Sequence, residues 1–77
     1  MKQQEWKEIF SNNLIDILED RGMSQAQLAR DSGLSVSRVS EYINRNATPT
    51  IFALINIADA LDMDIGELVD FGDTISG

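Results

Sequence analysis

The stretch SQAQLARDSGLSVSRVSEYINR, residues 24–45, decides the fold. Ser24 is a favourable N-cap, and Gln27 three positions later completes a capping-box pattern. Gly33 lies where a helix would end in a left-handed turn, and Ser35 can cap a helix that follows. The stretch therefore predicts two short helices joined by a Gly-Leu-Ser turn, which is a helix-turn-helix arrangement.

The second of these helices has two chemically different faces. Val39, Tyr42 and Ile43 recur at i, i+3 and i+4, so they predict an apolar face that packs on the body of the protein. A rotation of about 100° per residue places polar side chains opposite that face. Those side chains are Ser37, Ser40, Glu41 and Asn44, with Arg38 and Arg45 at the flanks. Such a face can offer hydrogen-bonding groups to base edges.

These residues resemble the DNA-binding segment of the lambda-repressor-like family of transcriptional regulators, also called the Cro/CI-type or XRE-type family. The family pattern stands here as Ser24-Gln25, Leu28-Ala29, Gly33, Ser35 and Val39-Ser40. Pro49 and the run IADALDMDIGEL resemble the family's fourth and fifth helices, so the resemblance covers about residues 9–69. Many members have Gly near the position of Asn46, where Asn also tolerates the left-handed conformation.

Outside the helix-turn-helix, helical periodicity predicts a long first helix. Its apolar residues begin at Trp6, and it should end near Arg21 after a frayed start at residues 1–5. The face opposite its apolar residues, which includes Ser11 and Asn12, is expected to be solvated.

Two further helices are predicted after the helix-turn-helix. A fourth helix is expected over about residues 49–61, with Thr48 as its N-cap and Pro49 in its first turn. A short fifth helix should begin after Asp64, with Glu67 completing a second capping-box-like pair. The expected fold is a compact all-α domain of five helices over residues 1–70, followed by a flexible tail at 71–77.

The composition supports one small globular domain. The chain has 77 residues, of which 43% are hydrophobic and 25% are charged. It contains neither an apolar run of about 18 residues nor a basic-then-apolar leader, so no membrane span or secretory signal is predicted and cytoplasm is the expected compartment. There is no Cys and no His, which removes disulfides and the common zinc sites. No cofactor, no metal and no enzyme activity are expected.

The charge is unevenly distributed along the chain. The net charge is -7, which by itself argues against a nucleic-acid partner. Residues 21–50 nevertheless carry a net charge of +2, whereas residues 51–77 carry -6 and no basic side chain. The field at the helix-turn-helix can therefore be positive while the whole molecule is anionic. The acidic C-terminal third fits either a solvated surface or a surface for a protein partner.

The resemblance implies which side chains contact double-stranded DNA. The expected base contacts are Val36, Ser37, Arg38, Ser40 and Glu41. The expected phosphate contacts are Gln25, Arg30, Asn44, Arg45 and Asn46. Several of them have another interpretation, because Val36 could simply pack, Arg30 could be solvated, and Asn46 could serve only the turn. Glu41 could accept a hydrogen bond from cytosine N4, repel phosphates, or hold Arg38 or Arg45 in place.

The fourth and fifth helices carry more apolar side chains than one buried face requires. Phe52, Ile65, Val69 and Phe71 are the expected interface of a homodimer. In the resembled family, a dimer places two recognition helices about 34 Å apart on successive major grooves. The expected function is sequence-specific repression of transcription from a palindromic operator. The alternative is a protein-interaction module on the same fold, antitoxin or antirepressor-like, with weak or secondary DNA binding.

Overall fold

The computed structural model describes residues 3–69, and within them it contains five helices and no strand. The helices are α1 (Gln3–Arg21), α2 (Gln25–Ser32), α3 (Val36–Ile43), α4 (Ile51–Leu61) and α5 (Ile65–Leu68). The predicted all-α fold of five helices is confirmed. The division into a domain at residues 1–70 and a tail at 71–77 stays a prediction, since 71–77 lie outside the described residues.

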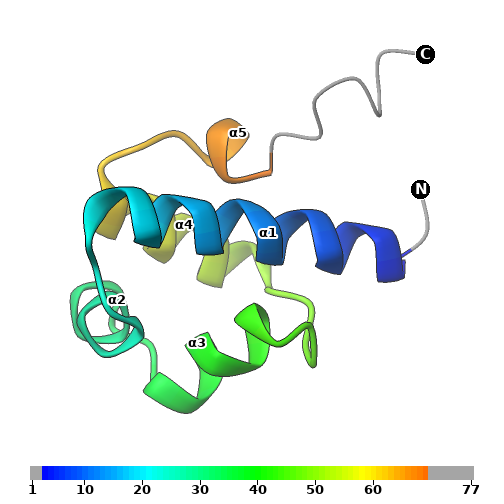
Figure 1. Cartoon of the computed structure of the whole chain (residues 1–77), viewed down its shortest axis with the longest axis horizontal. Coiled ribbons are helices and arrows are strands. Elements are labelled where there is room, and N and C mark those ends of the chain that lie inside the picture. The colour runs from blue at the N-terminus through cyan, green and yellow to red at the C-terminus, as the bar shows by residue number, and fades with distance from the viewer. Residues whose placement is uncertain (1–2, 70–77) are drawn as a thin grey trace.

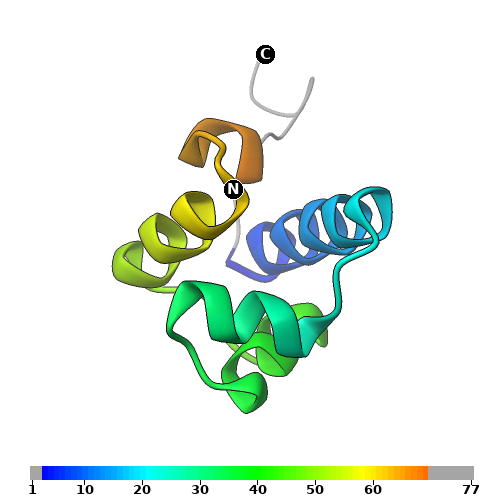
Figure 2. The same cartoon turned by 90° about the vertical axis from the view of Figure 1, so that its left-hand side faces the viewer.

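The helices surround one core. In Figure 1, α1 crosses the middle of the molecule with α4 behind it, while α2 and α3 lie below and α5 lies above. Figure 2 shows α1 and α4 on opposite sides of the core. α2 packs against α3 and α4, and α5 packs against α1 and α4. Among residues 3–69, no helix has both the length and the apolar character to cross a membrane.

Every helix contributes to the core, and aromatic rings join α1 to the back of α3. The rings of Phe10 and Tyr42 meet edge to face with centroids 6.1 Å apart, and Trp6 stacks on Phe10 at 5.7 Å. The buried hydrophobic residues are Phe10, Leu14, Leu18, Leu28, Ala29, Val39, Tyr42, Ala53, Leu54, Ile57, Ala58, Leu61 and Leu68.

The N-caps of the helix-turn-helix are confirmed. The Ser24 hydroxyl accepts a hydrogen bond from the Gln27 backbone N–H at 3.1 Å, and the Ser35 hydroxyl accepts one from the Arg38 N–H at 3.0 Å. Each cap satisfies one of the N–H groups that have no partner inside the helix.

The expected start of the fourth helix was wrong. α4 begins at Ile51, and Thr50 rather than Thr48 is its N-cap, with its hydroxyl accepting from the Ala53 N–H at 3.1 Å. Both threonines flank Pro49, which is buried and lies outside the helix.

The start of α1 also differs from expectation, whereas α5 begins after Asp64 as predicted but without the expected side-chain cap. α1 begins at Gln3, so residues 3–5 are helical rather than frayed. The acidic Glu5 lies in the first turn, where the helix dipole favours a negative charge. Asp64 occupies the N-cap position of α5, but its side chain makes no capping hydrogen bond. The N–H of Glu67 is instead bonded to the backbone carbonyl of Asp64 at 3.0 Å, which removes the donor that a capping carboxylate would use.

Four helices are followed within two residues by a residue with a positive φ, and Gly33 after α2 is one of these residues. Gly22 follows α1 with φ 63°, Arg45 follows α3 with φ 64°, and Asp62 follows α4 with φ 54°. After α3, the Asn46 N–H bonds to the Glu41 carbonyl at 2.8 Å and the Arg45 N–H to the Tyr42 carbonyl at 3.2 Å, which is a Schellman motif. The left-handed conformation expected at Asn46 therefore belongs to Arg45.

The expected solvation of the polar face of α1 was wrong for Ser11, which is fully buried. Its hydroxyl donates to the carbonyl of Ile43, the last residue of α3. The side-chain amide of Asn13 donates to the Leu68 carbonyl at 3.0 Å. Neighbouring polar residues of α1 thus fix the ends of α3 and α5, because buried polar groups are stable only when they are hydrogen-bonded.

Candidate nucleic-acid interface

The turn between α2 and α3 is built on Gly33. Gly33 has φ 76° and ψ 10°, and a Cβ built on it would meet no atom within 4 Å. Glycine is therefore required by the backbone conformation and not by lack of space. The adjacent Ser32 is buried, and its hydroxyl donates to the Ala29 carbonyl at 3.3 Å and accepts from the Leu34 N–H at 3.4 Å. The role of Ser32 was not predicted, although a Ser before a helix-ending Gly is a signal for such a local bond.

The back of α3 is buried and its outer face is accessible. Val39 is 0% exposed and Tyr42 is 4% exposed, which confirms the predicted apolar face. The five expected base-contacting residues all retain access to solvent: Val36, Ser37 and Arg38 are exposed, while Ser40 and Glu41 are partly exposed. Val36 is 51% exposed, so its methyl groups are available to a partner.

Polar side chains on the outer face of α3 are paired along the helix. The guanidinium of Arg38 lies 3.8 Å from the carboxylate of Glu41, measured from Nη1 to Oε2. The side-chain amide of Asn44 donates to the Ser40 hydroxyl at 3.1 Å. Of the roles considered for Glu41, this geometry matches the one that holds Arg38. An ion pair as exposed as this one contributes only about 0–1 kcal/mol.

The expected phosphate contacts lie at both ends of the motif. Gln25 is the first residue of α2, where free backbone N–H groups and the helix dipole favour an anion. Asn44, Arg45 and Asn46 follow α3 directly and are exposed, and Arg30 is exposed in the last turn of α2. The structure therefore leaves all five available to a phosphate, and each assignment stays a prediction.

Arg45 has a partner that the sequence did not reveal. Its Nη2 donates to the side-chain oxygen of Asn12 in α1 at 2.8 Å. A guanidinium has five N–H donors, so the remaining donors can still reach a phosphate. Asn12 was expected to be merely solvated, and no local pattern links it to a residue 33 positions away.

Charges near the back of α3 affect Tyr42. Burial raises the pKa of the Tyr42 hydroxyl above its ordinary value of 10.0, with Arg38 lowering and Glu41 raising that pKa. At neutral pH the hydroxyl is protonated, so α3 packs on an uncharged ring.

The comparisons with known proteins agree with this geometry. Residues 13–73 match the model of the Cro/C1-type helix-turn-helix DNA-binding domain. The chain belongs to this family. Over 45 residues the Cro/C1-type chain is 40% identical to the cryptic phage CTXphi transcriptional repressor RstR of Vibrio cholerae serotype O1. That match covers 58% of this chain and 40% of the repressor, so the matched part is about two fifths of the relative's length. No solved structure matches the chain.

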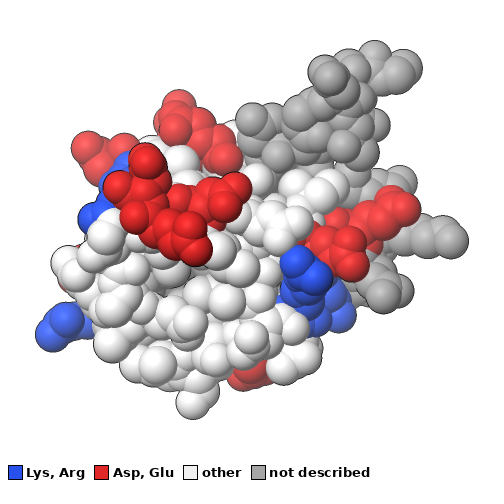
Figure 3. All heavy atoms as spheres, in the orientation of Figure 1, with Lys and Arg blue, Asp and Glu red and all other residues white. Residues whose placement is uncertain are grey.

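Acidic and basic side chains of this Cro/C1-type domain are separated on the surface of the molecule, as they are along the sequence. In Figure 3, acidic side chains gather at the upper left, over the end of α1 and the connection between α4 and α5. The surface over α2 and α3, below, is mostly uncharged and has basic side chains at its margins. The acidic end includes Asp59, Asp62 and Asp64, which line one shallow hollow.

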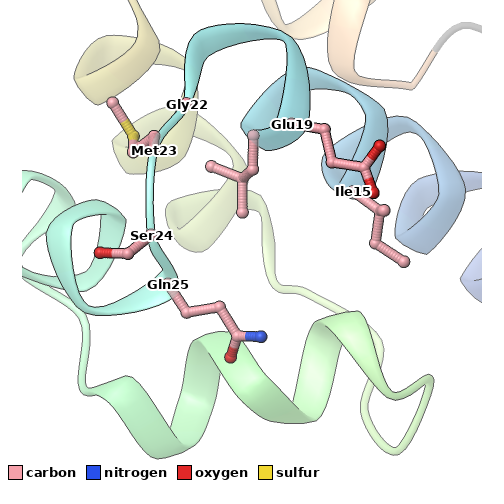
Figure 4. A pocket seen from close by; sticks show the side chains of 7 residues that line it. Ile15, Glu19, Gly22, Met23, Ser24 and Gln25 are labelled. Carbon is pink, nitrogen blue, oxygen red and sulfur yellow. The ribbon is translucent and has the colours of Figure 1, made fainter.

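A second hollow lies between the end of α1 and the start of α2. It has a volume of about 360 Å³ and is lined mainly by apolar surface of Ile15, Leu18 and Met23. Figure 4 shows the side chain of Gln25 directed from this region toward α3.

The outer side of α4 carries an apolar stripe, defined as Ile51, Phe52 and Ile55. These side chains are 59%, 75% and 41% exposed, respectively. Of the expected interface residues, Phe52 belongs to the stripe, while Ile65 and Val69 are half-buried against the core and Phe71 lies outside the described residues. The exposure of Ile51 and Ile55 was not predicted, although their i, i+4 spacing beside Phe52 could have indicated a shared face.

Proposed function

We propose that this protein is a transcriptional repressor that binds a palindromic operator as a homodimer, with α3 in the major groove. The observation that carries the proposal is the division of α3 into a fully buried back and an outer face of small polar and charged side chains. A recognition helix needs this division, because its position must be fixed while its outer side chains reach base edges. The repressor name of the relative supports the regulatory role.

In this proposal the start of α3 contacts the bases. Ser37 and Ser40 bond to base edges, Val36 contacts a thymine methyl group, and Arg38 bonds to the O6 and N7 atoms of guanine. A bidentate contact of this kind discriminates against the wrong base by about 1–3 kcal/mol. The phosphates on either side are bound by Gln25, Arg30, Asn44, Arg45 and Asn46, which fix the position of the helix without selecting a sequence.

The apolar stripe of α4 supports dimerisation. Three large exposed apolar side chains on one short helix are unusual for a surface that stays in water. A second copy of the chain could cover the stripe by the same residues in a two-fold symmetric contact. The Phe52→Asp variant should then be monomeric in sedimentation while keeping its helical content, and Phe52→Leu should stay dimeric. A wild-type chain that is monomeric at all concentrations would remove the dimer from the proposal.

Selection from random duplex DNA at low salt tests the function. The wild type should enrich an inverted repeat whose half-sites are one helical turn apart, because two recognition helices lie about 34 Å apart in such a dimer. The Ser37→Ala, Arg38→Ala double variant serves as the control, since both side chains are exposed and their loss should not unfold the protein. If the wild type enriches no sequence above the variant, the proposal fails.

The acidic end of the molecule favours a second candidate function, a module that binds a basic protein. Asp59, Asp62 and Asp64 are exposed there, and the net charge of the chain is -7. Replacing these three residues by Asn should abolish this function and leave DNA selection intact. The Ser37→Ala, Arg38→Ala variant should have the opposite effect, so the two candidates are separated by the same pair of proteins.

A further inference from the structure

The ion pair on α3 has a consequence for how the recognition helix distinguishes DNA sequences. α3, VSRVSEYI, carries one basic and one acidic side chain, and the two lie 3.8 Å apart. Their side chains are 53% and 43% exposed, so the pair lies at the surface of the helix that faces outward. The element that enters the groove is therefore electrically neutral and its arginine already has a partner.

We propose that Glu41 is a specificity-determining residue that makes Arg38 available only to a matching base pair. This inference rests on the proposed function, and it names the residue that limits binding to unmatched DNA. On unmatched DNA, Arg38 stays paired with Glu41 and contributes little to phosphate binding. On a matching site, guanine O6 and N7 replace the carboxylate as partners of the guanidinium.

The physical argument begins with non-specific binding. Affinity for any DNA sequence grows with the number of phosphates that Lys and Arg neutralise. Arg38 is the basic residue of α3, and Glu41 one turn further along cancels its charge. The recognition helix therefore has no net charge with which to attract phosphates. Glu41 in this way lowers the affinity of the protein for DNA of any sequence.

The second step concerns matched DNA. A surface ion pair in water is weak, whereas a bidentate contact between arginine and guanine inside the groove is stronger. Guanine O6 and N7 can therefore displace the carboxylate as partners of the guanidinium. The displaced carboxylate is an acceptor, and in the major groove it finds a donor at cytosine N4 or adenine N6. It is repelled by the acceptor atoms N7 and O6 of guanine, so the free Glu41 adds a second selection.

The experiment compares binding to the selected operator with binding to a scrambled duplex of equal length. The Glu41→Gln variant keeps the shape of the side chain and removes its charge. We expect up to about a fivefold gain in affinity for the scrambled duplex, a smaller gain for the operator, and a steeper salt dependence by about one unit of log-log slope. The ratio of specific to non-specific affinity should fall severalfold.

The Asp59→Asn variant is the matched control. It removes one negative charge from an exposed position of α4 at the acidic end. It should raise both affinities slightly and by the same factor, because its effect acts only through net charge. If Glu41→Gln changes the ratio no more than Asp59→Asn does, the inference is overturned.

A double variant distinguishes two ways in which Glu41 could weaken non-specific binding: by pairing with Arg38, or by repelling the phosphates itself. If Glu41 acts by holding Arg38, the gain in non-specific affinity should disappear when Arg38→Ala is added to Glu41→Gln. A gain that persists without Arg38 would overturn the inference, since repulsion of phosphates alone would then explain the effect. A wild type that selects no operator would instead overturn the proposed function, and the two failures are therefore distinct.

Discussion

The two helices of the helix-turn-helix end in different ways, although both ends pass through the left-handed conformation. α2 ends at Gly33 with φ 76°, and α3 is followed by Arg45 with φ 64°. Glycine takes this conformation without steric cost, whereas an L-residue with a long side chain is disfavoured there by roughly 1–2 kcal/mol. At Arg45 the two backbone bonds of the Schellman motif and a side-chain hydrogen bond to Asn12 at 2.8 Å together offset this cost. The comparison shows that a contact across the fold can hold a conformation that the local sequence disfavours.

The largest effect on stability is expected at Gly33, where α2 ends. Gly33→Val should lower the free energy of unfolding by about 2 kcal/mol or more, because a β-branched residue at φ 76° is strained even where space is free. Urea unfolding followed by circular dichroism measures the change. Gly66→Ala is the control, since Gly66 lies in α5 without a positive φ and should gain up to about 1 kcal/mol. Equal stability of Gly33→Val and wild type would refute the turn assignment.

The arginine end is tested by a pair of variants. Arg45→Ala and Arg45→Gly both remove the bond to Asn12, but only Arg45→Gly also removes the backbone strain. Arg45→Gly should therefore be more stable than Arg45→Ala by about 1 kcal/mol in urea unfolding.

The same pair tests the phosphate contact of Arg45. Both variants should bind operator more weakly, and the log-log salt slope should fall by about 1, because one phosphate contact is lost. Arg45→Lys keeps the charge and should retain that slope. Variants that bind operator as tightly as the wild type would show that Arg45 has a structural role only.

Local chemistry made most of the fold predictable. Serine caps precede α2 and α3, and Gly33 separates them, so the helix-turn-helix follows from short-range hydrogen bonds and backbone preference. The periodicity of apolar residues predicted which face of α3 is buried, because a helix that packs on a core has its apolar side chains, here Val39 and Tyr42, on one side. The outer face then follows from geometry, which is why the expected base-contacting residues are all accessible.

The features that escaped prediction depend on distant partners. Ser11 bonds to a carbonyl 32 positions away, and Arg45 bonds to Asn12 across 33 positions. No periodicity within α1 signals such contacts. The start of α4 had two locally equivalent caps, Thr48 and Thr50, and the residues around Pro49 do not distinguish between them. The exposure of Ile51 and Ile55 likewise depends on how α4 packs, not on its composition.

A smaller effect on stability is expected at Asn12, the hydrogen-bond partner of Arg45. Asn12→Ala removes the acceptor of Arg45 and leaves the arginine in place. The bond is exposed, so the loss in stability should be about 0.5 kcal/mol, at the lower end for a hydrogen bond. Asn12→Asp keeps an acceptor and should be at least as stable as wild type. A loss as large as that of Gly33→Val would mean that Asn12 has a further role in the fold.

An effect as small as that of Asn12→Ala extends the comparison to α4, which ends at Asp62 with φ 54°. Asp62→Gly should raise stability by about 0.5 kcal/mol, because aspartate tolerates the left-handed conformation better than arginine does and less strain remains to be relieved. Asp62→Asn controls for the lost charge in a chain of net charge -7, since Asn keeps the backbone preference of Asp. If Gly gives no more stability than Asn in urea unfolding, the gain is electrostatic. The strain at Arg45 would then also be smaller than its φ suggests, and the bond to Asn12 would not be needed to offset it.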